Sequence, residues 1–326
     1  MHETRNKAYA GFIIESKNIV EEKLMKVLII VFSPAGSTMK IAALLEERLI
    51  AANNQVQILN VTADKAMFRD GKIKEALAEK VNDHDLICFG SPVYEKHIEW
   101  YVKQIFKQLP KPDSKWGKLA VPFVTYGGVS SGVALHEAVK LLKKSGRTTI
   151  AAMKIESSHI ISKKLTTRVN EGMPGGEAVP VVEELVKRIS EIDKGNEEVK
   201  DFSKELNYHN FKEKMICKIM KETMLHKYKY PAFTIDNNKC IKCYKCVETC
   251  PVQRIGMENE FPKMAEKSRV CIHCFSCTGV CPSEAITFEK GDEDWSEIDR
   301  ILKLVSAEGS LFNSMETPRS AVYPLR

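Results

Sequence analysis

Eight cysteines lie close together in the C-terminal third of the sequence, with the spacing of metal ligands. The first run reads C-I-K-C-Y-K-C-V-E-T-C-P from residue 240, and the second reads C-I-H-C-F-S-C-T-G-V-C-P from residue 271. Three closely spaced thiolates on a turning loop can bind three irons of a cubane while the fourth points elsewhere. Zinc sites instead pair two C-x2-C knuckles, so the runs predict two 4Fe-4S clusters. The predicted ligands are Cys240, Cys243, Cys246, Cys250, Cys271, Cys274, Cys277 and Cys281.

The two runs are copies of one unit. The similarity continues beyond the cysteines, because P-V-Q-R-I-G-M after the first run matches P-S-E-A-I-T-F after the second. Tyr244 and Phe275 occupy equivalent places, where an aromatic ring either shields a cluster from water or fills a small core. A segment this short has little apolar material, so the clusters would also stabilise the domain.

Residues 233–289 resemble the bacterial two-cluster ferredoxins at every cysteine position. In that family the fourth cysteine of each run ligates the other cluster. The resemblance therefore implies that Cys281 completes the cluster of the first run, whereas Cys250 completes the cluster of the second run. It also implies a small α+β domain.

Composition narrows the classes that remain. The formal charge of +6 treats the cysteines as neutral, and two oxidised clusters of about −2 each would leave a net charge of about +2. We therefore expect no nucleic-acid partner. The longest apolar stretch falls short of the roughly 20 residues that a membrane span requires. Residues 1–24 lack the apolar core of a secretory signal, so we expect a cytoplasmic protein with an N-terminal extension. The other two cysteines, Cys88 and Cys217, should be buried thiols.

Strand and helix patterns alternate over residues 25–192. Residues 26–32 form a continuous apolar run, which suits a strand buried on both faces of a parallel sheet. A short loop follows, and then apolar residues recur at helical spacing from Ile41 to Leu49. Further strands are expected at 56–61, 86–89, 119–125 and 149–155, and further helices at 73–81, 98–109, 133–144 and 178–192. This alternation predicts an α/β fold with a doubly wound five-stranded parallel sheet.

Three loops at predicted strand ends carry residues suited to a ligand, because ligands of such sheets bind beyond the carboxyl ends of the strands. The loop S-P-A-G-S-T, 33–38, offers hydroxyls and backbone N–H groups at a helix N-terminus, which suits a phosphate. The loop G-S-P-V-Y-E-K-H, 90–97, follows the third strand. The loop T-Y-G-G-V-S-S-G, 125–132, has glycines that would let the backbone approach a flat ring.

Together these loops resemble those of the flavodoxin-like flavin-binding proteins over residues 25–192. The resemblance implies strand order 2-1-3-4-5 and a bound FMN, with Tyr94 as the candidate for stacking on the flavin. The third position of the first loop is Ala35, where flavodoxins usually place a hydroxyl, so one donor is missing. The implied FMN residues are Ser33, Gly36, Ser37 and Thr38 at the phosphate, Ser91, Pro92, Val93 and Tyr94 along the ring, and Thr125, Tyr126, Gly127 and Gly128 as the third loop.

Other features suggest no second active site. No G-x-G-x-x-G follows the first strand, which disfavours a nicotinamide site. His97, His136 and His159 should be surface or structural residues, since none lies beside a recognisable nucleophile or base. Residues 193–230 should form a linker and a connecting helix that packs an apolar face, including Phe211, against one of the domains. Residues 231–290 should form the ferredoxin domain, and residues 291–326 a mobile or loosely packed tail.

The order of these parts resembles flavodoxin–ferredoxin fusion proteins. It predicts an electron-transfer flavo-iron-sulfur protein, as an oxidoreductase of anaerobic metabolism, that passes electrons between its clusters and FMN. The acceptor would be a redox partner protein or a small molecule. The same sequence leaves open a pure electron carrier, or a flavin-free flavodoxin-like docking platform beside an active ferredoxin domain.

Overall fold

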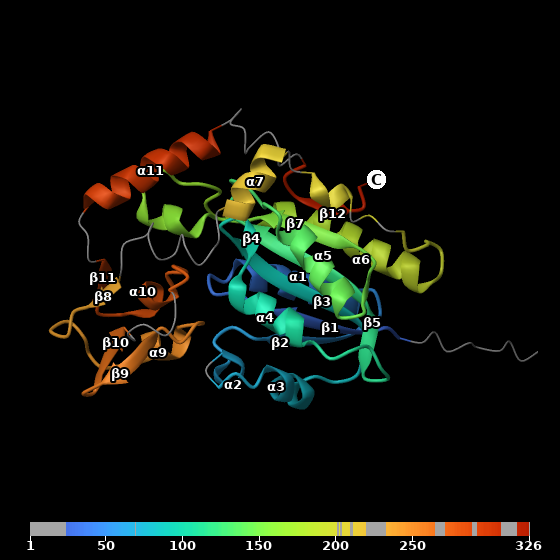
Figure 1. Cartoon of the computed structure of the whole chain (residues 1–326), viewed down its shortest axis with the longest axis horizontal. Coiled ribbons are helices and arrows are strands. Elements are labelled where there is room, and N and C mark those ends of the chain that lie inside the picture. The colour runs from blue at the N-terminus through green and yellow to red at the C-terminus, as the bar shows by residue number, and fades with distance from the viewer. Residues whose placement is uncertain are drawn as a thin grey trace, which may run out of the picture.

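The computed structural model describes residues 24–68, 70–200, 202, 204–208, 211–219, 233–264, 271–288, 292–307 and 318–325. It contains a large sheet covered by helices and a smaller cysteine-bearing domain beside one end of that sheet (Figure 1). The N-terminal extension lies almost wholly outside the described residues. Among the described helices, none combines the length and the apolarity needed to cross a bilayer.

The large sheet has the predicted parallel order. Strands β2 (Gln55–Asn60), β1 (Lys26–Val31), β3 (His84–Tyr94), β5 (Trp116–Tyr126) and β7 (Ala152–Glu156) lie side by side in that order, which is 2-1-3-4-5 in the predicted numbering. The short strand β6 (Thr148–Thr149) pairs with β5, and β4 (His97–Ile98) forms a hairpin with the end of β3. The prediction of a doubly wound flavodoxin-like sheet is confirmed.

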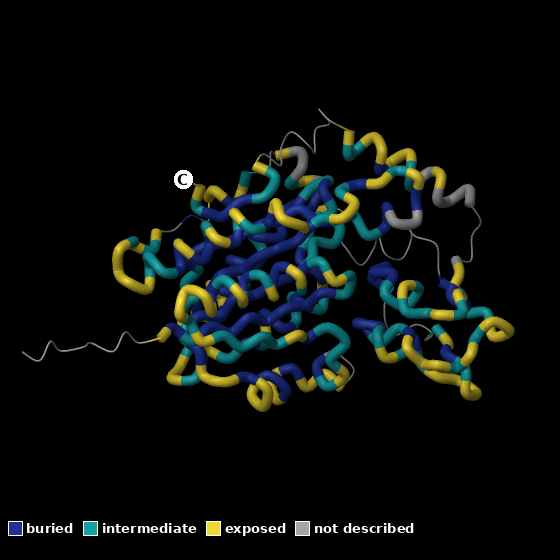
Figure 2. The backbone as a smooth tube through the Cα atoms, turned by 180° about the vertical axis from the view of Figure 1, so that it is seen from behind, coloured by how far each residue is buried: buried dark blue, intermediate teal, exposed yellow. Residues whose placement is uncertain are grey.

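Helices cover both faces of the sheet, so alternate residues of its central strands enter two cores (Figure 2). In β1, Leu28 and Ile30 face one core, and Val27 and Ile29 face the other, which explains the uninterrupted apolar run. One face carries α1 (Ser37–Ala51) and α6 (Val179–Asp193). The opposite face carries α3 (Ile73–Lys80), α4 (Trp100–Gln108) and α5 (Ala134–Lys144), with the short α2 (Lys65–Phe68) at its border. Cys88 is buried, as expected.

A sixth main strand was not predicted. Strand β12 (Ala321–Tyr323) pairs antiparallel with β7 at the edge of the sheet. The guanidinium of Arg188 donates to the carbonyl of Pro324, and the rings of Tyr208 and Tyr323 stack. The expectation of a loose tail is therefore wrong for residues 318–325, because a three-residue strand has too little pattern to be recognised in the sequence.

The connecting helix also differs from expectation. In α7 (Phe211–Ile219), the side chains of Phe211 and Ile219 are exposed, whereas Cys217 is buried. The helix is attached to the sheet domain through polar contacts, since Nε2 of His97 lies 2.9 Å from the carbonyl oxygen of Cys217. Phe211 and Ile219 of the predicted apolar face are therefore not packed against either domain. Met220 and Met224, which belong to the same predicted face, lie outside the described residues.

The cysteine-bearing domain repeats one backbone unit twice. Strand β8 (Phe233–Ile235) pairs with β11 (Ile286–Phe288), and β9 (Ile255–Glu258) pairs with β10 (Phe261–Met264). Helices α9 (Lys245–Thr249) and α10 (Ser276–Val280) follow equivalent turns. Left-handed backbone conformations recur in pairs 31 residues apart, at Lys242 and His273, Tyr244 and Phe275, and Gln253 and Glu284. The internal repeat is thus conformational as well as sequential.

The last long helix joins the two parts of the molecule. Helix α11 (Asp292–Ser306) places the carboxylate of Asp299 2.7 Å from the backbone nitrogen of Thr167.

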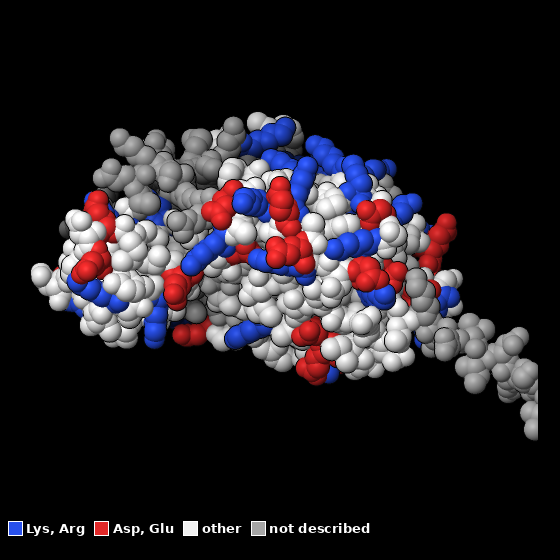
Figure 3. Space-filling view, turned by 90° about the horizontal axis from the view of Figure 1, so that it is seen from below, with Lys and Arg blue, Asp and Glu red and all other residues white. Residues whose placement is uncertain are grey.

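On the face of the molecule seen from below, basic and acidic side chains are interspersed, without one large region of a single sign (Figure 3).

Candidate flavin pocket and cluster sites

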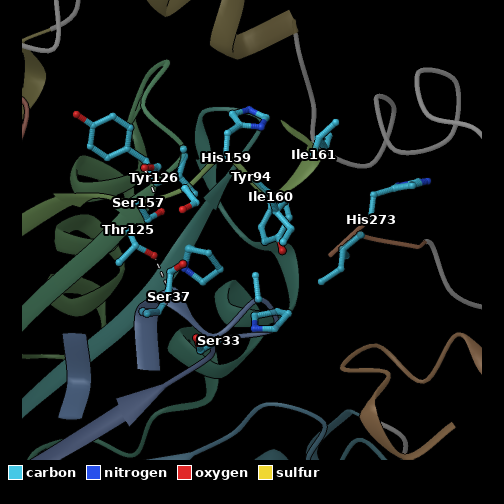
Figure 4. Close-up of a pocket in the computed structure, with 18 of the residues that line it drawn as sticks. Ser33, Ser37, Tyr94, Thr125, Tyr126, Ser157, His159, Ile160, Ile161 and His273 are labelled. Atoms are coloured by element: carbon cyan, nitrogen blue, oxygen red, sulfur yellow. Dashed lines mark hydrogen bonds between the residues drawn. The ribbon is translucent and has the colours of Figure 1, made fainter. Parts of the chain in front are cut away.

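A pocket opens at the carboxyl ends of β1, β3, β5 and β7, with about 690 Å³ of atom-free space including its mouth. Figure 4 shows residues of several loops converging on it. The lining comprises Ser33, Pro34, Ala35, Ser37, Thr38, Pro92, Val93, Tyr94, Glu95, Thr125, Tyr126, Gly127, Ser157, Ser158, His159, Ile160, Ile161, Ile272 and His273.

The first loop presents the N-terminus of α1 to this pocket. Gly36 adopts a left-handed conformation (φ 89°) that turns the chain into the helix, and it provides no side-chain cap. The hydroxyl of Ser33 accepts a hydrogen bond from the backbone nitrogen of Met39 at 2.8 Å, so its own proton remains available to a ligand. The helix dipole and these donors favour an anion such as phosphate.

The first and third loops are joined at the floor of the pocket. The hydroxyls of Thr38 and Thr125 lie 2.7 Å apart, and both residues are buried (Figure 4). One hydroxyl must donate to the other, which leaves a single proton of the pair for a ligand. The strands β1 and β5, from which these loops emerge, both flank β3, so the parallel sheet fixes their separation.

The second loop forms a tight hairpin that carries Tyr94. Strand β3 continues to Tyr94, and Glu95 and Lys96 then turn the chain with positive φ angles into β4. The backbone of Lys96 lies against Gly132, where an added Cβ would be 2.1 Å from its carbonyl oxygen. The hairpin is thereby held against the third loop, and the Tyr94 ring extends into the pocket (Figure 4).

Three predicted flavin residues do not line the pocket. Gly36 is exposed and shapes the turn. Ser91 is buried, and its hydroxyl donates to the carbonyl of Pro92. The carbonyl of Gly128 accepts from Arg319, and an added Cβ there would be 2.4 Å from the Asn170 amide nitrogen. Gly128 is therefore required for close packing against Asn170. The sequence alone does not distinguish this role from the predicted close approach of the backbone to a flavin ring. The other nine predicted residues line the pocket.

A fourth loop was missed by the sequence analysis. Residues 157–161 follow β7 and close one side of the pocket. His159, expected to be structural, packs against Gly127, where an added Cβ would lie 2.7 Å from its ring. Because ligands of such sheets bind beyond the carboxyl ends of the strands, the position of this loop after β7 is the signal that marks it. His136 is half-buried on α5 and does not line the pocket.

The remaining wall comes from the cysteine-bearing domain. Ile272 and His273, between Cys271 and Cys274, reach the mouth of the pocket. The ring of His273 is directed away from the flavodoxin-like loops (Figure 4) and lies 5.7 Å from the Phe233 ring. This contact between domains could not be foreseen from sequence, because the runs are more than 200 residues from the first loop.

Electrostatic interactions connect cysteines of each run with the fourth cysteine of the other run. Cys271, Cys274 and Cys277 each lie within electrostatic range of Cys250, and Cys246 lies within range of Cys281 and Cys240. Burial raises the pKa of Cys271 to about 12 and that of Cys274 to about 11. Such buried thiols would be neutral by themselves, so the positive charge of iron is what would stabilise them as thiolates.

Backbone amides point at the sulfur atoms. The amide nitrogen of Arg254 lies 3.0 Å from Sγ of Cys250, and that of Ala285 lies 3.3 Å from Sγ of Cys281. Burial opposes ionisation of Cys281, but hydrogen bonds from Ala285 and Ser283 outweigh it and lower its pKa. Amide donors of this kind stabilise the negative charge of a cluster. The donor set fits iron–sulfur clusters.

Comparison with known proteins agrees with both sites. A family model described as NADPH-dependent FMN reductase matches residues 25–162, and one described as 4Fe-4S dicluster domain matches residues 239–285. The chain therefore has an N-terminal FMN reductase or flavodoxin-like domain and a C-terminal 4Fe-4S dicluster domain. These matches imply FMN and 4Fe-4S clusters as cofactors, and together an electron-transfer flavo-iron-sulfur protein. No curated protein matches the chain significantly.

Solved structures resemble parts of the chain. Rubredoxin oxygen:oxidoreductase from the anaerobe Desulfovibrio gigas has 18% identity and a TM-score of 0.38 over 52% of this chain, which spans 36% of that protein. A flavodoxin from the domain Archaea has 19% identity and a TM-score of 0.35, covering 52% of this chain and 99% of its own. Two-electron reduced Megasphaera elsdenii flavodoxin has 22% identity and a TM-score of 0.33, covering 49% and 98%.

Proposed function

We propose that this chain passes electrons between its two 4Fe-4S clusters and an FMN in the pocket, as an oxidoreductase of anaerobic metabolism. The observation that carries the proposal is that Ile272 and His273, between two cysteines of the second run, line the same pocket as the phosphate loop. Clusters transfer single electrons and a flavin accepts one or two, so their proximity would allow single electrons to accumulate for a two-electron transfer.

In this proposal the phosphate of FMN binds at the N-terminus of α1. Ser33 and Ser37 would donate from their hydroxyls, and Ala35 would contribute only its backbone N–H. Tyr94 would contact the ring from the β3–β4 hairpin, and the backbone of residues 125–127 would lie along its edge. The lost hydroxyl at Ala35 would weaken binding by about 1.5–3 kcal/mol at most.

We further assign the clusters in the crossed arrangement. Cys240, Cys243, Cys246 and Cys281 would hold the first-run cluster. Cys271, Cys274, Cys277 and Cys250 would hold the second-run cluster. The electrostatic grouping of the cysteines supports this assignment. The second-run cluster would be nearer the flavin, since its loop forms the pocket wall, and the first-run cluster would be farther away.

The test is anaerobic purification, followed by titration with FMN and reduction. We expect about one FMN and eight irons per chain, with flavin absorbance that bleaches when the clusters are reduced first. A protein with full iron content that binds no FMN would contradict the proposal and favour the flavin-free docking platform.

A second measurement separates an enzyme from a pure carrier. If the reduced protein is reoxidised by small-molecule acceptors with saturation kinetics, the oxidoreductase is supported. If it is reoxidised only by other redox proteins, the chain is a carrier.

A further inference from the structure

The two copies of the cysteine run face different surroundings. Ile272 is 3% exposed, whereas its counterpart Ile241 is 63% exposed, and Phe275 is 6% exposed, whereas Tyr244 is 36% exposed. Cys274 is buried and Cys243 is exposed. The two copies of one backbone unit therefore differ in how far their side chains are exposed to solvent.

The second copy is covered by the flavodoxin-like domain. The hydroxyl of Ser276 donates to the carbonyl of Pro34 in the phosphate loop, and Ile272 lies in the pocket wall. On this copy Ile272 and Ser276 lie against the flavodoxin-like domain, whereas the Phe275 ring packs on Phe233 within the cysteine-bearing domain. The first copy offers an apolar residue, an aromatic residue and a ligand cysteine in the same geometry with this face open to solvent.

The exposed copy differs from the covered one in charge. Residues 239–250 contain Lys239, Lys242 and Lys245 and one carboxylate, Glu248, while the equivalent residues 270–281 contain neither lysine nor carboxylate. Lys242 pairs with Glu260 at 3.0 Å, on the turn between β9 and β10. Nearby, Glu258 pairs with Lys263. Among the described residues, Lys239 and Lys245 make no ion pair, so their charges are directed to solvent.

We infer that the face formed by Lys239, Ile241, Cys243, Tyr244 and Lys245, here called the entry face, docks a small acidic electron-carrier protein. This inference rests on the proposed function and identifies the partner of its relay. Apolar residues at the centre with charges around them are the usual anatomy of a transient interface. Free lysines would attract an acidic carrier and orient it with its redox centre toward Cys243.

The transfer is a balanced one-electron exchange. The reduced centre of the carrier loses one electron, the oxidised first-run cluster gains it, and no bond forms or breaks. The electron would then continue to the second-run cluster and the pocket. Cys243 is the exposed member of its proposed ligand set, so a docked carrier could approach it directly.

The test measures electron transfer from a reduced, acidic bacterial ferredoxin to the fully loaded protein by stopped-flow spectroscopy. We expect the bimolecular rate constant to fall steeply with ionic strength. The double variant K239E/K245E should lower it by about tenfold or more at low salt. The matched control K118E/K187E reverses two exposed lysines of the flavodoxin-like domain and should leave the rate unchanged. A rate insensitive to salt, or equal losses in both variants, would overturn the inference.

Two further measurements make the result specific. Once the clusters of K239E/K245E are reduced, electron transfer from them to FMN should proceed at the unaltered rate, because the relay itself is intact. If FMN in the unaltered protein stays oxidised after the clusters have been reduced, the proposed function fails instead. Light scattering that shows a dimer dissociated by Ile241→Asp would assign the entry face to a second copy of this chain and would also overturn the inference.

Discussion

The hydroxyl of Ser276 donates a hydrogen bond to the carbonyl oxygen of Pro34 and lies 3.3 Å from Sγ of Cys274. One side chain thus contacts a cysteine of the second run and the loop at the N-terminus of α1. The two parts of the molecule meet where the shortest route from cluster to pocket would pass. Electron transfer should depend on this contact more than on either domain alone.

Replacing Ser276 with alanine should slow reduction of FMN by the clusters several-fold, because a hydrogen bond between the two domains is lost. The hydrogen bond itself should be worth about 1 kcal/mol. Stopped-flow absorbance after rapid reduction measures the rate. Ser283→Ala is the control, since its hydroxyl lies 3.7 Å from Sγ of Cys281 and makes no hydrogen bond to the described part of the flavodoxin-like domain. Equal effects of both substitutions would argue against a role for the contact.

Cys250→Ser should damage the cluster of the second run, although Cys250 belongs to the first run. Cys281→Ser should damage the cluster of the first run. Because only the second-run cluster would adjoin the pocket, Cys250→Ser should abolish FMN reduction through the clusters. Iron content and EPR of each variant identify the lost cluster. Loss of the cluster within the mutated run would refute the crossed assignment.

Gly127→Ala should weaken FMN binding by tenfold or more, since the new Cβ would lie 2.7 Å from the His159 ring and 2.9 Å from its Cα. Backbone cannot yield as a flexible side chain can, so the fourth loop must shift and alter the pocket wall. Fluorescence titration with FMN measures the change. Gly176→Ala, where no atom lies within 4 Å of an added Cβ, should bind FMN normally. Unchanged affinity in Gly127→Ala would show that this loop does not border the flavin.

Two histidines should give opposite pH dependences of stability. Burial opposes protonation of His97, but the Glu137 carboxylate at 2.9 Å and the Cys217 carbonyl outweigh it and raise its pKa. Its contribution is therefore fully present below the ordinary value near 6.5 and is lost as pH rises through the raised pKa. Burial lowers the pKa of His84, so its contribution is lost as pH falls below that ordinary value.

Denaturant unfolding between pH 5 and 8 (about 1.5 units either side of the ordinary histidine pKa) should reveal both. His97→Gln should lose stability mainly at low pH, and His84→Gln should flatten the acidic side of the profile. The Lys103 ammonium, 3.0 Å from the second oxygen of Glu137, opposes protonation of His97 and should keep the rise in its pKa modest. A profile of His97→Gln parallel to that of the unaltered protein would contradict this account.

Arg319→Ala should destabilise the protein by about 1–2 kcal/mol, because it leaves the nearly buried Glu156 carboxylate without its cation. The same guanidinium donates to the carbonyl of Gly128, so the third loop should loosen and FMN should bind more weakly. Thermal unfolding and FMN titration measure the two effects. Arg319→Lys should restore much of the stability but little of the loop contact. Full FMN affinity in Arg319→Ala would limit β12 to a purely structural role.

Much of the fold was predictable because its signals are local. Three signals lie next to one another in the sequence: the apolar run of β1, the loop after it and the 3.6-residue period of α1. An apolar run of this length followed by a helix is typical of a parallel strand buried on both faces. The cysteine spacing was equally specific. The strand order and nine of the twelve flavin residues in the pocket wall followed from the resemblance rather than from the pattern.

The remainder depends on contacts between distant segments. Nothing in A-V-Y near the C-terminus indicates pairing with β7. Nothing in C-I-H-C indicates that Ile272 lines a pocket whose first loop lies some 240 residues before it in the sequence. In α7, by contrast, a packed apolar face was predicted from the sequence, but apolar side chains of this helix are exposed. Helical periodicity reports which residues share a face, but it does not report whether anything lies against that face.

The return of the chain to the sheet at β12 has a further consequence. The ferredoxin domain begins after α6 and ends before a strand of the same sheet, so it is inserted in the flavodoxin-like domain rather than appended to it. An inserted domain is anchored at both ends, which restricts its motion and raises the effective concentration of its clusters at the pocket. Cutting the chain after residue 307 would leave a single tether and every cofactor ligand in place.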